Sequence, residues 1–163
     1  RRYKPDKGEN LYRRGVYMHW QRTFLHPSLL AFDAPTREEC TAERVVSNTP
    51  QQALVLLNDP IFVEAARVFS ERIQRQGGKD FSSRLRFAFR LALQREPAPA
   101  ETKIFESLFD RHLGLYRVDP GAARALVGTG DWPVADKLPP SEHAAWTSVT
   151  RVLLNLHETL VRY

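Results

Sequence analysis

The sequence predicts an all-α protein, and three observations support this class. Apolar residues recur every three or four positions in several segments, the spacing that gives a helix one buried face. Proline or a capping residue opens most of these segments, and glycine or proline closes several of them. No alternating segments joined by a hairpin turn are present. We expect one domain over residues 1–163, with about six helices and a long irregular loop after the first helix.

The first expected helix lies within residues 11–24, where large apolar residues recur every four positions: Tyr12, Val16 and Trp20. The His26-Pro27 pair is expected to end this helix, because a residue before proline avoids the helical conformation. Residues 29–47 mix polar and apolar side chains without a helical period, so they are expected to form the irregular loop.

The clearest local signal is a pair of helix starts. Thr49 supplies a capping hydroxyl, Pro50 suits the first helical position, and Gln52 is placed to reach back to the cap. A short helix is therefore expected from Pro50 to about Leu57. Asp59, which is followed by proline, is expected to cap the next helix.

Four longer helices are expected after this point, with a brief one between residues 119 and 127. Their apolar faces are Phe62, Ala66, Phe69 and Ile73; Phe81, Leu85, Ala88, Phe89 and Ala92; Ile104, Phe105, Leu108, Phe109 and Leu115; and Ala145, Val149, Val152, Leu153, Leu156 and Leu160. The last face extends over several turns, so we expect the final helix to be central to the core.

Composition narrows the class further. The chain has 163 residues, 42% hydrophobic and 26% charged, which suits a globular domain with a core of its own. No apolar run approaches the roughly 20 residues that span a bilayer. The net charge is +5, but acidic residues lie among the scattered arginines, so nucleic-acid binding is not expected. The single cysteine, Cys40, excludes an internal disulfide and a Cys-x-x-Cys-His haem-attachment site in this segment.

Several motifs follow one another in order over residues 22–59. They are Arg22, then HPS at 26–28, then FDAPTREEC at 32–40, then NTPQQALVLLND at 48–59. Together they resemble a planctomycete-specific C-terminal domain of unknown function, found in cytochrome c-associated proteins. The runs RLRFAFR at 84–90 and VLLNLHET at 152–159 resemble its central and closing helices, so the resemblance extends from about residue 11 to the end. His157 departs from the acidic or asparagine residue expected there.

The resemblance implies a helical domain in an exported protein of the periplasm or cell envelope. It implies fusion to another uncharacterised domain and often to a cytochrome c-like region, so any haem would lie elsewhere in the full-length protein and no cofactor is expected in this segment. The chain begins with Arg1 and not with methionine, and we interpret it as the C-terminal part of a larger protein. The resemblance implies no established activity.

Polar residues without helical spacing gather between His26 and Asp59. They form the candidate ligand-binding or structural cluster, which consists of His26, Asp33, Arg37, Cys40, Asn48, Gln51, Gln52, Asn58 and Asp59. In the structural interpretation, Asp33 and Arg37 form an ion pair that holds the loop, Cys40 packs as a small hydrophobe, and the amides satisfy the backbone. In the functional one, the arginine favours a Cys40 thiolate with His26 as its base, or the amides bind a sugar or peptide.

No catalytic residue is assigned, and no metal site is expected because the five histidines lack ligand spacing. The sequence thus favours a non-catalytic module that packs on neighbouring domains of the same polypeptide. The alternative is part of an enzyme or ligand site in residues 26–59, with polysaccharide as a possible ligand. A third hypothesis is polyanion binding by the basic surface.

Overall fold

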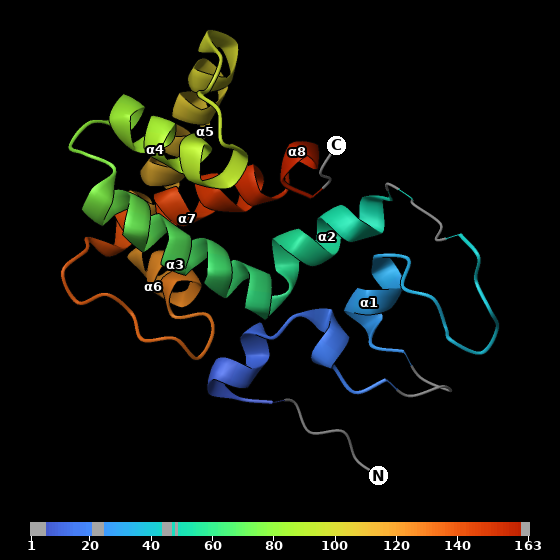
Figure 1. Cartoon of the computed structure of the whole chain (residues 1–163). Helices are drawn as coiled ribbons and strands as arrows, with labels where there is room; N and C mark the ends of the chain where they lie inside the picture. Colours follow the sequence, from blue (N-terminus) through green and yellow to red (C-terminus); the bar gives the residue numbers. More distant parts are fainter. Residues whose placement is uncertain (1–5, 21–24, 44–46, 48, 161–163) are drawn as a thin grey trace. The chain divides into compact units, whose positions relative to one another are not determined.

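The computed structural model describes residues 6–20, 25–43, 47 and 49–160. The chain divides into two compact units, residues 1–55 and 56–163, and each is described by itself. The described residues contain helices and no strand, so the predicted all-α class is confirmed (Figure 1). Six of their eight α-helices have at least eight residues. The single domain expected over the whole chain stays a prediction.

In the first unit, the helix expected within residues 11–24 is wrong over its described part. Two short 3-10 helices, Gly8–Tyr12 and Gly15–Tyr17, stand there instead, and residues 21–24 lie outside the described ones. The apolar side chains expected to form a helical face, Tyr12 and Val16, are exposed. A short helix gains most of its stability from burying one face, and these exposed side chains do not provide a buried face.

His26-Pro27 begins a helix and does not end one. α1, Pro27–Ala31, has His26 at its N-cap, and the His26 imidazole accepts a hydrogen bond from the Ser28 amide. The chain then runs irregularly through its described residues to α2, Pro50–Asn58, which begins where the sequence predicts. The irregular loop is therefore shorter than expected by one helical turn.

The second unit begins in the last turn of α2 and continues into α3, Pro60–Gln76. The Asp59 carboxylate accepts a hydrogen bond from the Ile61 amide at 2.9 Å, which confirms the predicted cap. Gly77 ends α3. A Cβ at this position would lie 2.6 Å from the Ile73 carbonyl oxygen, so the close approach requires glycine.

Three helices follow α3, and local residues fix their starts. α4 is Phe81–Leu93, α5 is Pro99–Val118 and α6 is Pro120–Val127. The carboxylates of Asp80 and Asp119 cap α4 and α6 through amides three residues on, each at 2.9 Å. Proline occupies the first position of α5 and α6, where its missing amide hydrogen costs nothing.

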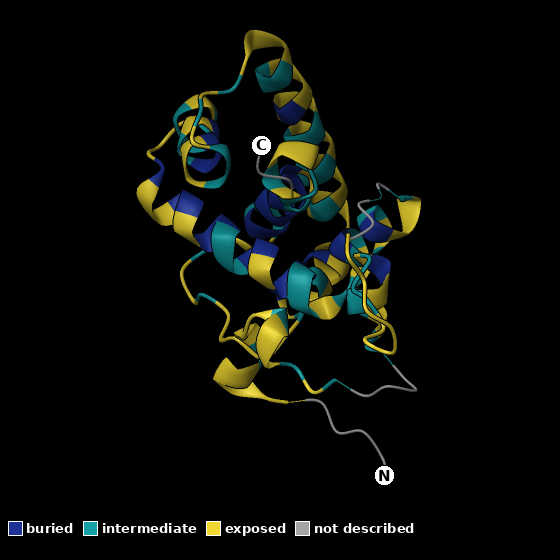
Figure 2. Cartoon of the chain, turned by 45° about the vertical axis from the view of Figure 1, so that its right-hand side comes forward, coloured by how far each residue is buried: buried dark blue, intermediate teal, exposed yellow. Residues whose placement is uncertain are grey.

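α7, Pro140–Leu154, is the central helix of the second unit, as the sequence predicts. It contacts α3, α4, α5 and α6, and residues 143–150 are all buried (Figures 1 and 2). The Trp146 ring lies 5.3 Å from the ring of Phe81 and 5.1 Å from that of Phe109, measured between centroids. This aromatic cluster joins α7 to α4 and α5.

Some residues of the expected apolar faces lie outside the core. α7 ends at Leu154, and a separate short helix, α8 (His157–Leu160), follows it. Leu156 is half-buried against the core, whereas Val152 and Leu160 are exposed. On α5, Phe105 is buried but Ile104 and Leu115 are exposed. Periodicity thus located the helices but made their buried faces too wide.

An ion-pair network holds α8. Arg95, after α4, lies 2.7 Å from Glu101 of α5 and 2.8 Å from Glu158 of α8. These hydrogen bonds raise the pKa of Arg95, and the Arg95 guanidinium lowers the pKa of Glu101 to about 2.

None of the described helices combines the length and apolar character that crossing a membrane requires.

Leu153→Ala should lower the free energy of unfolding by roughly 2–5 kcal/mol, because Leu153 is fully buried in the core cluster. The neighbouring Val152→Ala, at a residue 37% exposed, serves as the matched control. Urea denaturation of both variants measures the difference. Equal small losses in the two variants would contradict the central position of α7.

Candidate functional site

Asp33 is the centre of a polar cluster in the first unit. Its carboxylate accepts hydrogen bonds from the Ser47 amide at 2.8 Å, the Ser47 hydroxyl at 2.6 Å and the Gln52 side chain at 3.4 Å. The bonds from Ser47 are the main reason why the pKa of Asp33 is lowered. The carboxylate is thus engaged in tying the loop to α2.

Thr49 and Gln52 complete this cluster at the start of α2. The backbone amide of Gln52 donates to the Thr49 hydroxyl at 3.4 Å, and the backbone amide of Thr49 donates to the Gln52 side-chain oxygen at 3.3 Å. This reciprocal pair is a capping box, so the predicted cap is confirmed. Gln52 is buried, and its side-chain nitrogen also donates to the Ser47 hydroxyl.

Arg37 does not form the expected ion pair with Asp33. Its guanidinium lies over the Trp20 ring, 4.0 Å from the centroid. Both Asp33 and Arg37 have positive φ angles, 55° and 62°, which are uncommon for residues other than glycine. The Asp33 carboxylate is committed to Ser47, and Arg37 is held instead by a cation–π contact.

The remaining candidates are dispersed. Cys40 and Gln51 are exposed, and Asn58 lies at the exposed end of α2. His26 caps α1 through its Nδ1 atom, and Asp59 caps α3. Asn48 lies outside the described residues. The structure therefore brings Asp33 and Gln52 together, and it gives His26 and Asp59 capping roles that local sequence explains.

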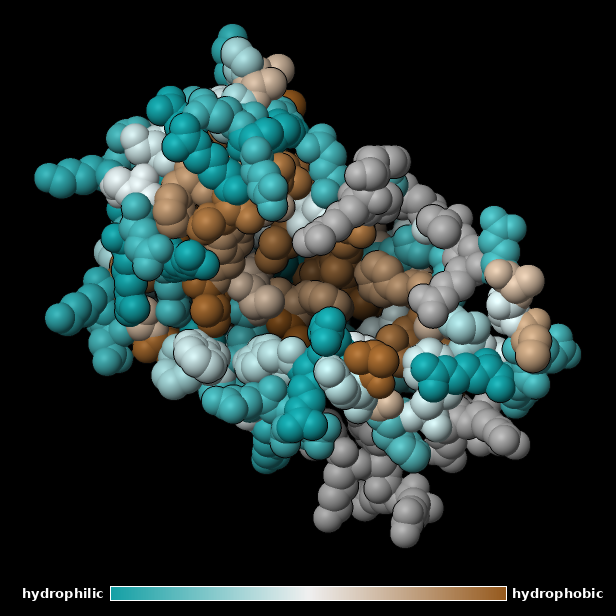
Figure 3. All heavy atoms as spheres, in the orientation of Figure 1, coloured by the Kyte–Doolittle hydropathy of each residue, from teal (hydrophilic) through white to brown (hydrophobic). Residues whose placement is uncertain are grey.

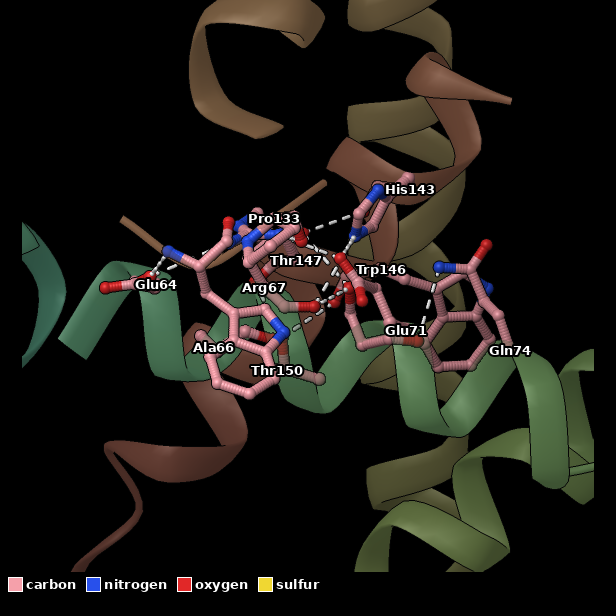
Figure 4. A network of polar contacts seen from close by, with 12 residues as sticks. Glu64, Ala66, Arg67, Glu71, Gln74, Pro133, His143, Trp146, Thr147 and Thr150 are labelled. Atoms are coloured by element: carbon pink, nitrogen blue, oxygen red, sulfur yellow. Dashed lines mark hydrogen bonds and ion pairs between the residues drawn. The ribbon is translucent and has the colours of Figure 1, made fainter. Parts of the chain in front are cut away.

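The sequence did not reveal a second polar cluster, which is buried in the second unit between α3 and α7 (Figure 4). Arg67 is fully buried, and its Nη1 atom lies 2.8 Å from a carboxylate oxygen of Glu71. Its guanidinium also donates to the carbonyl oxygens of Trp132 at 2.6 Å and Pro133 at 3.3 Å. The Glu64 carboxylate accepts a hydrogen bond from the backbone amide of Trp132. Two charged residues of α3 thus hold the loop between α6 and α7.

His143 lies on the α7 side of this buried cluster. Burial is the main cause that lowers the pKa of His143, so the imidazole is neutral at neutral pH. Its Nε2 atom lies 3.4 Å from the Arg67 carbonyl oxygen and 3.7 Å from the Glu71 carboxylate. The contact with Glu71 is therefore not an ion pair at neutral pH.

This cluster contains the charged residue types of a functional site, but its hydrogen bonds and ion pairs are those of a structural element. Its charged groups are turned toward one another and toward backbone atoms, and none is exposed. Among the residues that the structure describes, no three His, Cys, Asp or Glu side chains lie in an arrangement able to hold a metal ion. The spacing of Glu64, Arg67 and Glu71 was the available signal, but it is also typical of a solvated helix face.

Several arginines of the second unit are neutralised locally. Arg84 lies 2.6 Å from Glu142, and Arg86 and Arg90 both pair with Glu96. These pairs, with that of Arg95, remove much of the free positive charge that a polyanion would need.

Residues 1–109 match a protein family of unknown function, DUF1553 (PSD1). The chain belongs to this family. The DUF1553 match ends within α5, so it covers the whole first unit and the helices α3 and α4. The resemblance inferred from the motifs extends further, to the end of the chain. No curated protein and no solved structure matches the chain significantly.

Thr49→Ala should cost on the order of 1 kcal/mol, because it removes the cap of α2. Thr41, which is exposed in the same unit, provides the control Thr41→Ala. Thermal denaturation followed by circular dichroism measures both changes. If the two substitutions have the same effect, the capping box does not stabilise α2.

Arg67→Met should cost about 3–5 kcal/mol, because it leaves the buried carboxylates of Glu64 and Glu71 without their cation. Arg72→Met changes an exposed arginine of the same helix and should stay within about 0.5 kcal/mol of the wild type. Chemical denaturation gives both values, and amide hydrogen exchange should show faster exchange in residues 128–139 of Arg67→Met only. Unchanged exchange in that loop would contradict the role of Arg67 in holding it.

Proposed function

We propose that the chain is a non-catalytic helical module that packs on neighbouring domains of a larger polypeptide. One observation carries this proposal: the first unit exposes large apolar side chains and buries few. Among the described hydrophobic residues of 1–55, only Ala31 is buried. Those exposed are Tyr12, Val16, Tyr17, Leu30, Phe32 and Leu54.

This pattern differs from that of the second unit, where aromatic and aliphatic side chains form a buried core. Hydrophobic atoms also lie at the surface over α1 (Figure 3). Exposed apolar patches rimmed by polar residues mark interaction surfaces in soluble proteins. A neighbouring domain that covers them would supply the core that this unit lacks.

The alternative, an enzyme or ligand site in residues 26–59, has less support. The Asp33 carboxylate accepts hydrogen bonds from the Ser47 amide and the Gln52 side chain, and the backbone amide of Gln52 donates to the Thr49 hydroxyl. The described polar groups that remain there are spread over α1, the loop and α2, so they do not converge on one point. Among the residues of this segment that the structure describes, no converging group of side chains supports polysaccharide binding.

We also propose that the larger polypeptide is exported and associated with a cytochrome, as the motif resemblance to planctomycete proteins implies. The complete gene product should then carry an export signal and a Cys-x-x-Cys-His motif outside this segment. Cell fractionation and haem staining of the complete protein test both points. A cytoplasmic protein without haem would contradict this part of the proposal.

The packing proposal is tested on the full-length protein. Tyr17 and Leu30, which are 64% and 61% exposed here, should be protected from hydroxyl-radical labelling several-fold relative to the urea-unfolded protein. Leu30→Asp should destabilise the full-length protein by more than the roughly 0.5 kcal/mol typical of an exposed position. Thr41→Asp is the control. Full labelling of Tyr17 and Leu30, together with a neutral Leu30→Asp, would contradict the proposal.

A further inference from the structure

α5 carries an apolar stripe that the described residues of its own unit leave uncovered. Ile104, Leu115 and Val118 are 66%, 56% and 87% exposed. Leu115 and Val118 follow Ile104 by eleven and fourteen residues, about three and four turns of an α-helix, so all three lie on one side. Exposed residues recur along α5 in Figure 2, and its first turns project beyond α4 in Figure 1. The core side of the same helix is formed by Phe105 and Phe109.

A single cation lies at the middle of this stripe. Arg111 is exposed and follows Ile104 by seven residues, or two turns. Among the described residues no carboxylate lies within ion-pair distance of Arg111, whereas Arg84 has one such partner and Arg95 has two. The stripe therefore presents an unpaired positive charge flanked by apolar side chains.

Gly114 adds a third feature to this helix. It is exposed, and a Cβ at its position would meet nothing within 4 Å, so the fold itself does not require glycine there. Glycine inside a helix costs about 1 kcal/mol relative to alanine. The residue leaves room for a partner to approach the backbone of α5 closely.

We propose that this α5 face, formed by Ile104, Arg111, Gly114, Leu115 and Val118, seats an amphipathic helix of an adjoining domain. That helix carries a carboxylate between apolar residues, and the carboxylate pairs with Arg111. This inference rests on the proposed function, because it takes the partner from the same polypeptide.

A second copy of the chain fits the stripe less well. Arg111 is midway between Ile104 and Val118, so a two-fold antiparallel pairing of the stripe would place Arg111 against its own copy. A parallel pairing in register would do the same. Like charges that face each other oppose association, and a partner carboxylate removes this cost.

The test uses the full-length protein with benzoylphenylalanine at residue 104 and mass spectrometry after irradiation. The expected product is an intramolecular cross-link to a helical peptide outside residues 1–163 that contains Asp or Glu. Arg111→Glu should reduce the yield at least several-fold, and Arg111→Lys should retain most of it. The same label at Glu106, an exposed residue off the stripe, should give no such product.

Three results would overturn the inference: no cross-link from residue 104, a cross-link between two copies, or a yield that Arg111→Glu does not change. Circular dichroism of each variant shows whether it is folded, and Arg111→Lys keeps the charge in a folded protein. If Leu30 is protected while residue 104 forms no cross-link, only the α5 inference fails. If Leu30 is also exposed, the proposed function fails with it.

Discussion

The fully buried guanidinium of Arg67 is the constraint on which the second unit depends. A charge in the interior is tolerated only when charged partners and hydrogen bonds replace the water it has lost. Arg67 takes these from Glu71 in its own helix and from the carbonyl groups of residues 132 and 133. The same requirement therefore fixes the position of the loop that leads into α7. Hydroxyl groups extend the contact, because Thr150 of α7 donates to the Ala66 carbonyl at 2.8 Å.

The packing of α7 follows from this arrangement. Small residues such as Ala144 and Ala145 let the neighbouring helices approach closely, while Trp146 fills the space between α4 and α5. α7 is consequently buried on several sides and has no solvent-exposed face between residues 143 and 150. The polar side chains buried there bond across to α3 or back to their own helix, as Thr147 does with the His143 carbonyl.

The first unit is held differently. Its described residues bury little apolar surface, and hydrogen bonds from Ser47, Thr49 and Gln52 define the connection between the loop and α2. Four polar residues that look like parts of a site in the sequence instead accept hydrogen bonds from backbone amides: His26, Asp33, Gln52 and Asp59. The fold does not bury several large apolar residues of this unit and of α5. These exposed side chains are the basis of the proposed role in packing against other domains.

The sequence alone determined the features that depend on one helical turn. The caps at Thr49, Asp59 and Asp119, the prolines after them and the glycine after α3 act within four residues, so they could be predicted. Tertiary structure decided what depends on partners far along the chain. Periodicity suggested a helix within residues 11–24, but Tyr12 and Val16, which would form its buried face, are exposed in the structure. Likewise, no residue near Arg67 in the sequence predicts that a loop 65 residues away accepts hydrogen bonds from its guanidinium.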